Sequence, residues 1–166
     1  MKMIAAADEK WGIGKNGGLL CHLPGDMKFF RETTAGSTVV MGRVTFESLP
    51  GKKGLPKRRN IVITRREDYK AEGAEVVHSG EELKAAVAGT DPDSIFVIGG
   101  AEIYAGLLPM CDTVYITKIY RDFDADRFLP DLDATGEFEA EPLSEIKEEN
   151  GIRYQFFKYT RVKDAE

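Results

Sequence analysis

Asp26 is the residue whose neighbours in the sequence best suit acid–base chemistry. Phe29 and Phe30 follow it at spacings of three and four, so all three side chains share one face if this stretch is helical. Aromatic residues at this spacing predict a core-facing stripe, and a carboxyl beside such a stripe loses water and keeps its proton to higher pH. The alternative is a solvated acid at a helix N-terminus, which the helix dipole favours. This stretch alone leaves both interpretations open.

Three short segments have the pattern of phosphate-binding turns. Gly42-Arg43 and Gly99-Gly100 each lie between an expected strand and an expected helix, and Arg65-Arg66 follows another strand. Backbone N–H groups at such helix starts bind phosphate, and arginine suits a 2′-phosphate. Ligands of α/β sheets bind at the carboxyl ends of strands, where these segments lie. The alternatives are ordinary strand-to-helix turns and solvated arginines.

The glycine-rich segment 12–18 contains the spacing G-x-G-x-x-G. A dinucleotide-binding fingerprint requires a helix to begin directly after these glycines, whereas here the helix begins only at Pro24. The sequence therefore argues against a Rossmann motif. It favours a flap that closes over an active site, with Ile13 and either Leu19 or Leu20 as its apolar contacts.

Two charged stretches allow a binding role. Residues 50–59 carry five cations, which either form a solvated patch or hold a substrate carboxylate, for which an arginine fork is suited. Asp122, Asp124 and Asp126 have the spacing that begins a calcium loop. Arg127 stands where such a loop requires glycine, and the flanking helices are missing, so no metal site is predicted.

Hydrophobic periodicity predicts an α/β fold. The expected helices span residues 24–34, 79–89 and 101–108, with a short one after Gly42; the expected strands span residues 3–7, 37–41, 60–64, 74–78, 94–98, 113–120, 138–141 and 152–162. A turn over residues 148–151 joins the last two strands. Strands and helices alternate up to Tyr104, and strands dominate afterwards. The length of 166 residues predicts one domain over residues 1–166. We expect a mostly parallel, twisted central sheet of about eight strands, helices on both faces and an antiparallel C-terminal edge strand.

Composition limits the classes of function. The chain has 166 residues and a net charge of −5, which argues against a nucleic-acid-binding surface. Two cysteines, Cys21 and Cys111, form no disulfide framework and are typical of a reducing compartment. The first apolar run is too short for a signal peptide, and no run approaches the ~18 residues of a membrane span. We expect a cytoplasmic monomer without membrane or nucleic-acid partners.

Six segments together resemble dihydrofolate reductase across essentially the whole chain. In order, they are MIAAADEKWGIGKNGGLL, HLPGDMKFF, VVMGRVTFESL, LPKRRNIVITRR, FVIGGAEIYAGLLP and VYITKI. Each is a weak signal by itself, but all six occur in the family's order and at its spacing. The resemblance implies NADPH-dependent reduction of 7,8-dihydrofolate to tetrahydrofolate, with hydride transfer to C6 and protonation at N5. It also implies a role in one-carbon metabolism and a target for antifolates.

The resemblance assigns roles on the substrate side. It implies that Asp26 anchors the amino and ring nitrogens of the pterin and promotes protonation at N5 through water. Thr117 hydrogen-bonds in the same polar cluster, and Arg58 clamps the carboxylate of the glutamate tail. The residues implied to line the folate pocket are Ile4, Ala5, Met27, Phe30, Leu49, Leu55 and Ile98.

The cofactor implied by the resemblance is NADPH. The residues implied to meet the nicotinamide and its ribose are Ala6, Ile13, Gly14, Gly18 and Leu19. Those implied to hold the phosphates are Gly42, Arg43, Thr45, Gly99, Gly100, Ala101, Glu102, Ile103 and Tyr104. Thr64 and Arg65, together with Arg43, would select the 2′-phosphate. The family also has a cis peptide bond between two glycines, here Gly99-Gly100.

One position departs from the family pattern. Cys21 stands where the family usually has tryptophan, and Trp11 lies earlier in the flap and does not align there. We expect a wetter or wider pocket with altered kinetics but the same reaction. Two alternatives remain at this point. One is the pyrimidine reductase of riboflavin synthesis, which has the same fold, and the other is a nucleotide-binding protein that has lost catalysis.

Overall fold

A computed structural model describes residues 1–162 of the chain. Its strands are β1 (Lys2–Ala7), β2 (Gly12–Gly14), β3 (Thr38–Gly42), β4 (Arg59–Ile63), β5 (Glu75–Val77), β6 (Ile95–Gly99), β7 (Thr113–Ile119), β8 (Arg127–Phe128), β9 (Phe138–Pro142), β10 (Lys147–Glu149) and β11 (Ile152–Arg161). Its α-helices are α1 (Pro24–Thr34), α2 (Arg43–Glu47), α3 (Gly80–Ala86) and α4 (Ala101–Leu107). Single 3₁₀ turns span Pro50–Lys52, Pro92–Ser94 and Leu108–Met110. Across residues 1–162, no helix is both long and apolar enough to span a membrane.

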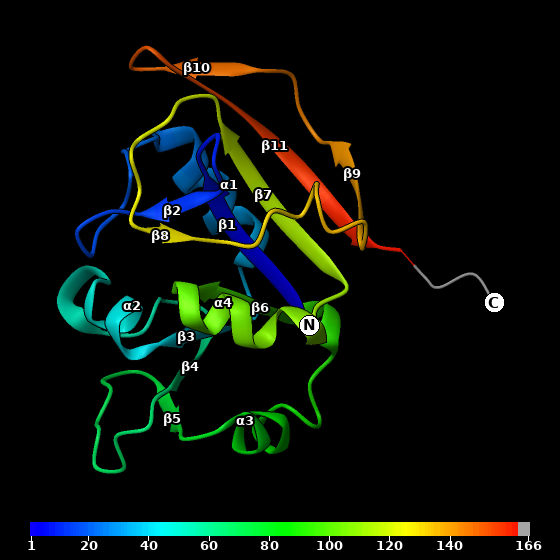
Figure 1. Cartoon of the computed structure of the whole chain (residues 1–166). Coiled ribbons are helices and arrows are strands. Elements are labelled where there is room, and N and C mark those ends of the chain that lie inside the picture. The colour runs from blue at the N-terminus through cyan, green and yellow to red at the C-terminus, as the bar shows by residue number, and fades with distance from the viewer. Residues whose placement is uncertain (163–166) are drawn as a thin grey trace.

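One nine-stranded sheet runs through the molecule in the order β10-β11-β7-β1-β6-β3-β4-β5, and β9 also pairs with β11 (Figure 1). The strands from β7 to β5 in this order are parallel to their neighbours, whereas β11 is antiparallel to β7. This confirms the predicted sheet class. β1 is small and apolar on both sides and lies between β6 and β7, where both of its faces are covered. The carboxyl ends of the parallel strands therefore gather along one edge of the sheet.

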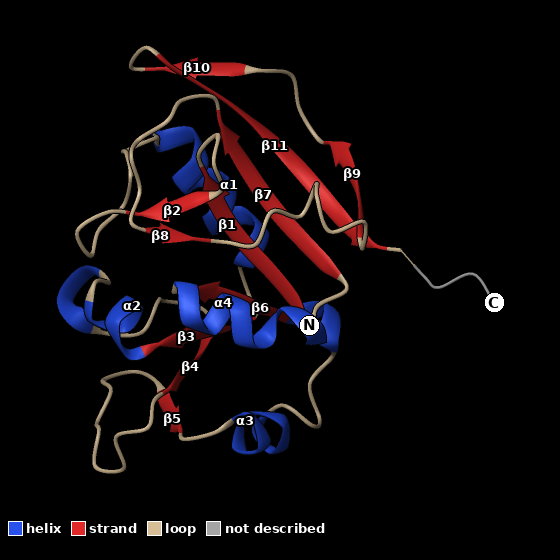
Figure 2. Ribbon diagram, viewed as in Figure 1, coloured by secondary structure: helices blue, strands red, loops and turns tan. Residues whose placement is uncertain are grey.

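Helices cover both faces of the sheet (Figure 2). Met3, Ala5 and Ala7 of β1 pack with side chains of α3 and α4. Ile4, which alternates with them, packs with aromatic side chains of α1 and α2. The period-two alternation of the strands thus separates the core into two layers, with α1 and α2 on one side and α3 and α4 on the other.

The start and end of α1 follow from local chemistry. Pro24 occupies the first turn, where its missing N–H costs nothing, and Gly36 has a φ of +73° just past the helix end. The predicted helix over residues 24–34 is confirmed. The predicted turn over residues 148–151 is wrong in its first half, because Glu148 and Glu149 belong to β10 and pair with β11. A polar three-residue strand carries no hydrophobic alternation, so only its partner reveals it.

A second sheet of only two strands, β2 and β8, was not predicted. Asp8 organises the loop that enters it and is only 6% exposed. Its Oδ1 accepts hydrogen bonds from the backbone N–H groups of Lys10 and Gly12 at 2.9 and 2.8 Å, and its Oδ2 accepts one from Phe123 N–H at 3.2 Å. One carboxylate thus joins the segment after β1 to the segment after β7.

We expect Asp8→Ala to lower the free energy of unfolding by about 1–3 kcal/mol, because it leaves buried N–H groups without an acceptor. Asp8→Asn keeps one oxygen for Lys10 and Gly12 but turns an amide donor toward Phe123, so its loss should be smaller. Urea unfolding monitored by circular dichroism measures both. Equal stability of Asp8→Ala and the native protein would contradict this role.

Candidate active site

The structure brings Asp26 and Thr117 into direct contact. Thr117 Oγ1 donates a hydrogen bond to Asp26 Oδ1 at 2.6 Å. Thr117 lies in β7, opposite Ala6 of β1 and Phe156 of β11, and is 2% exposed. Asp26 lies in the first turn of α1. Two elements separated by 91 residues thus form one polar pair beside the central strand.

Aromatic side chains surround this pair on the α1 side. Phe29 stacks on Phe156 with ring centroids 4.2 Å apart and meets Tyr115 edge-on at 6.3 Å. Burial raises the pKa of the Asp26 carboxyl above its ordinary value. The Thr117 hydrogen bond opposes this rise in pKa, and the negative charge of Glu149 adds to it. The arrangement is that of an acid able to hold a proton at higher pH than a solvated aspartic acid.

Five of the seven residues expected to line a folate pocket lie together. Ile4 is part of a buried cluster on the α1 side of the sheet, and packed against it are Phe30, Leu49, Leu55 and Ile98. The other two are not part of this cluster. Ala5 packs on the opposite face of the sheet, and Met27 is 42% exposed. Any contact of these two residues with a substrate stays a prediction.

Arg58 is anchored at the end of α1. Its Nε donates to Thr34 Oγ1 at 3.0 Å, and its terminal nitrogens donate to the carbonyl oxygens of Pro56 and Arg31. Burial and the charge of Arg31 lower the pKa of its guanidinium. Within residues 1–162, no carboxylate forms an ion pair with Arg58. Two neighbouring cations at one end of the apolar cluster suit an anionic ligand group.

The glycines at the ends of β3 and β6 permit close approach. A Cβ on Gly42 would lie 3.0 Å from the Ile103 side chain, and one on Gly99 would lie 3.3 Å from Thr45 Oγ1. Gly99 has a φ of +131°, which favours glycine, and the expected cis peptide bond between Gly99 and Gly100 is present. The starts of α2 and α4 therefore face each other across two glycines.

The first turn of α4 contains four of the nine residues expected to hold the phosphates, namely Ala101, Glu102, Ile103 and Tyr104. Glu102 is exposed, whereas Tyr104 is 6% exposed. Tyr104 donates its hydroxyl proton to Ile4 carbonyl oxygen at 2.8 Å, and its backbone N–H donates to Gly100 oxygen at 2.8 Å. The helix start is thus tied to β1.

The residues expected to select a 2′-phosphate lie at neighbouring strand ends. Thr64 follows β4 and is 9% exposed, and its Oγ1 accepts a hydrogen bond from Arg66 N–H at 3.2 Å. Arg65 is exposed. Arg43 begins α2 and forms an ion pair with Glu47 at 2.8 Å. The guanidinium of Arg43 is therefore held along its helix by an i,i+4 pair.

The expected flap is attached to the loop before β8. Asn16 N–H donates to Asp126 Oδ2 at 2.9 Å, and Asp126 N–H donates to Gly14 oxygen at 3.0 Å. Within the flap, Lys15 and Gly18 exchange two backbone hydrogen bonds. Ile13 packs against the core, whereas Leu19 is 80% exposed. Of the predicted apolar contacts, Ile13 alone is packed against the core in this conformation.

Cys21 lies on the wall of the same region as Asp26. It is half-buried and, like Ala6, Phe29 and Phe123, packs against a buried cluster made by Leu23, Ile119 of β7 and three side chains of β11. Burial and the neighbouring Asp26 raise the pKa of its thiol, so the thiol stays protonated at neutral pH. Trp11 lies on the other side of the sheet, 5.8 Å from the Tyr159 ring, and does not replace an aromatic residue at position 21.

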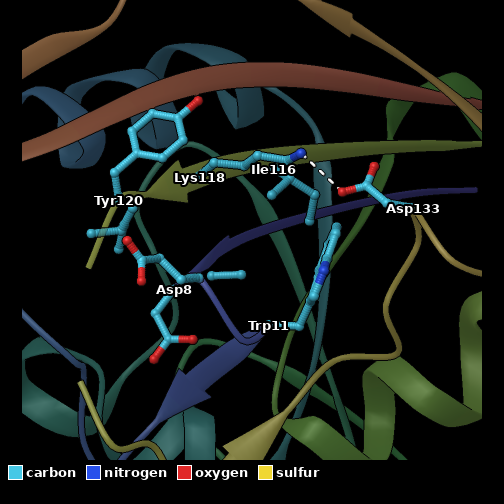
Figure 3. Close-up of a pocket in the computed structure, with 9 residues that line it drawn as sticks. Asp8, Trp11, Ile116, Lys118, Tyr120 and Asp133 are labelled. Carbon is cyan, nitrogen blue, oxygen red and sulfur yellow. Dashed lines mark hydrogen bonds and ion pairs between the residues drawn. The ribbon is translucent and has the colours of Figure 1, made fainter. Parts of the chain in front are cut away.

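A separate cavity of about 200 Å³ lies beside β1 and β7 (Figure 3). Lys118 crosses it and pairs with Asp133 at 3.0 Å, and its ammonium group lies over the rings of Trp11, Phe157 and Tyr159. Lys118 follows Thr117 in β7, so the two side chains point to opposite faces of the sheet. This cavity is therefore distinct from the candidate site around Asp26.

Sequence reasoning missed the residues that hold the start of α1. Glu149 of β10 accepts hydrogen bonds from Gly25 N–H at 2.7 Å and from the Tyr154 hydroxyl. Their separation from Asp26 along the chain hides them from any local pattern. The one local signal is Gly25, a glycine inside a helix, which indicates that another group approaches its backbone closely.

Comparisons with known proteins agree with this geometry. The sequence model of the family described as dihydrofolate reductase matches residues 1–161. The dihydrofolate reductase of Bacillus subtilis is 36% identical over 97% of this chain and 94% of its own length. That of Neisseria meningitidis serogroup B is 41% identical over 96% of each chain.

A solved structure extends the likeness to three dimensions. It is described as dihydrofolate reductase from Enterococcus faecalis complexed with NADP(H) and RAB-propyl. It superposes with a TM-score of 0.84 at 39% identity, covering 98% of this chain and 96% of that one. Because the family match, the sequence identity and the fold agree over nearly the whole length, the chain belongs to the dihydrofolate reductase family.

Proposed function

We propose that this protein reduces 7,8-dihydrofolate to 5,6,7,8-tetrahydrofolate with NADPH. The observation that carries the proposal is the hydrogen-bonded pair of the half-buried Asp26 and the buried Thr117 beside an apolar cluster, in a chain of this family. A pterin offers an amino group and ring N–H groups on one edge and an apolar ring system. A carboxyl set against aromatic and aliphatic side chains is complementary to both.

The residues at the strand ends fit NADPH. A side chain at Gly99 or Gly100 would crowd the Thr45 hydroxyl, and one at Gly42 would crowd the Ile103 side chain, so the three glycines leave backbone open to a ligand. Backbone N–H groups at the starts of α2 and α4 are suited to phosphate oxygens. Thr64, Arg65 and Arg43 offer a hydroxyl and two cations at the next strand end, which suits a 2′-phosphate. Ala6, Ile13, Gly14, Gly18 and Leu19 are proposed to meet the nicotinamide and its ribose.

NADPH, when bound, supplies the hydride that reduces C6 of the pterin. Asp26 binds the pterin amino group and ring nitrogen through its carboxyl oxygens, with Thr117 fixing the orientation of one oxygen. The proton for N5 comes from solvent under the control of Asp26, through water. Because Asp26 is buried, it stays protonated to higher pH than a solvated acid.

Arg58 is proposed to bind the carboxylate of the glutamate tail. Its anchoring by Thr34 orients the guanidinium, and the nearby Arg31 leaves an excess of positive charge for an anion to neutralise.

We further propose a cytoplasmic monomer. The supporting features are the two free cysteines, Cys21 and Cys111, and the net charge of −5.

Asp26→Asn should lower kcat for dihydrofolate reduction at pH 7 by about 10²–10⁴-fold, because an amide cannot promote protonation of N5 through water as a carboxyl does. The decrease in NADPH absorbance on adding dihydrofolate measures this. Asp68→Asn, the same change at an exposed loop residue, should leave kcat unaltered. A native protein that binds NADPH but does not oxidise it with dihydrofolate would overturn the proposed function and direct attention to a riboflavin-type substrate.

The reaction rate should fall as pH rises through the pKa of Asp26, since the protonated carboxyl is the active form. Thr117→Val removes the hydrogen bond that favours the ionised form, so the midpoint of the pH–rate profile should move up by about one pH unit. Thr113→Val makes the same change four residues earlier in β7 and serves as the control. A midpoint that moves down in Thr117→Val would contradict this account.

Cys21→Trp should make the pocket beside Asp26 narrower, because the indole fills more space than the thiol. We expect the Kd of dihydrofolate to fall by about tenfold, which corresponds to about 1.4 kcal/mol of additional apolar contact. The reaction itself should stay the same. Fluorescence titration with dihydrofolate measures the Kd, with Cys21→Ser as the control of similar size. An unchanged Kd and unchanged kinetics would show that position 21 does not shape the pocket.

A further inference from the structure

The start of α1 is held by a hairpin from the far end of the chain. Glu149 Oε1 accepts a hydrogen bond from Gly25 N–H at 2.7 Å, and the Tyr154 hydroxyl donates to the same oxygen. Glu149 ends β10 and Tyr154 lies in β11, so the β10–β11 hairpin supplies both groups. Gly25 directly precedes Asp26. The hairpin therefore acts on the backbone one residue away from the candidate acid.

The helix has no cap of its own at this position. The N-cap residue, Leu23, carries no hydrogen-bonding side chain, and Pro24 has no N–H. The N–H groups of Asp26 and Met27 both donate to Leu23 oxygen at 3.0 Å. Gly25 N–H therefore needs an acceptor from elsewhere, and a carboxylate also interacts favourably with the helix dipole. Glu149, 124 residues away in the sequence, supplies both the acceptor and the negative charge.

The packing at Gly25 shows that this contact is built into the fold. A Cβ at Gly25 would clash with both Tyr154 Oη and Glu149 Oε1. Tyr154 is 2% exposed, and its ring meets Phe156, which stacks on Phe29 of α1. The Tyr154 hydroxyl and the Glu149 carboxylate occupy the space that a side chain at Gly25 would need. The stacked aromatic rings keep the hairpin packed against α1.

Glu149 also sets the charge around Asp26. Burial and Glu149 raise the pKa of Tyr154, so its hydroxyl stays a hydrogen-bond donor to Glu149. The other titratable or polar groups around Asp26 are Thr117, Cys21, Tyr104 and Tyr154. Burial keeps the three titratable ones neutral at pH 7. A groove of about 240 Å³ between α1 and the hairpin, beside Gly25 and Tyr154, is lined by the charged residues Lys28 and Glu32 of α1 and Lys147 of β10.

We propose that Glu149 is a positioning residue for the reaction: together with Tyr154 it holds the first turn of α1, and thereby the Asp26 carboxyl, in place. This inference rests on the proposed function, because the acid that it positions is the one assigned there. Glu149 itself does not touch the reacting atoms. Its influence reaches the substrate through the backbone of Gly25 and through the electrostatic potential at Asp26.

Two variants separate the charge from the contact. Glu149→Gln keeps an oxygen acceptor for Gly25 and Tyr154 but removes the negative charge. The pKa of the Asp26 carboxyl and the midpoint of the pH–rate profile should therefore both fall by about 0.5–1 pH unit. The rate at low pH should stay within about twofold of native, since the protonated acid is still held in place. Glu149→Ala also removes the contact, so its kcat should fall by about tenfold at every pH.

The Asp26 titration is measured in the ligand-free protein from the ¹³C chemical shift of its labelled carboxyl. Glu148→Gln is the matched control, because it removes the same charge from the neighbouring exposed residue of β10. Glu148→Gln should leave the titration midpoint of Asp26 at the native pH. If Glu149→Gln leaves it there too, the inference is wrong. Failure of the proposed function would be distinct, since the native protein would then not reduce dihydrofolate whatever the carboxyl titration shows.

Discussion

The site depends on burying one carboxyl without leaving it unpaired. An ionisable group next to stacked aromatic rings is costly unless hydrogen bonds compensate for the lost water. Asp26 meets this condition through Thr117, which stands on a strand inside the sheet and cannot move independently of it. Helix α1 must therefore lie against β7 and β11 in one position, and the stack of Phe29 on Phe156 maintains that position.

The substrate side and the cofactor side share the same central strands. β1 contributes Ile4 to the apolar cluster on one face, and its Ile4 carbonyl accepts the hydrogen bond of Tyr104 from α4. β6 contributes Ile98 to that cluster and ends in the glycine pair at which α4 starts. Because both proposed ligands would be held by β1 and β6, their reacting atoms can be brought together without a separate hinge between two domains.

Much of this arrangement could be predicted from local patterns. Apolar runs predicted the strands of the parallel sheet, and Pro24 with Gly36 marked the limits of α1. The spacing of Phe29 and Phe30 allowed a desolvated Asp26 as one of two interpretations, because helical periodicity fixes which side chains share a face. The short strands β2, β8 and β10 could not be predicted this way, since polar or glycine-rich segments of two or three residues become strands only through their partners.

The sequence by itself determined the order of the four helices and of the strands of the parallel sheet, and the chemical type of each site residue, because these depend on backbone propensity and side-chain chemistry. Only the tertiary structure decided which residues meet. It placed Thr117 on Asp26, Asp8 on the loop after β7, and Glu149 on Gly25. These contacts join residues 91 to 124 positions apart. Such contacts follow from strand order and register, which no local spacing encodes.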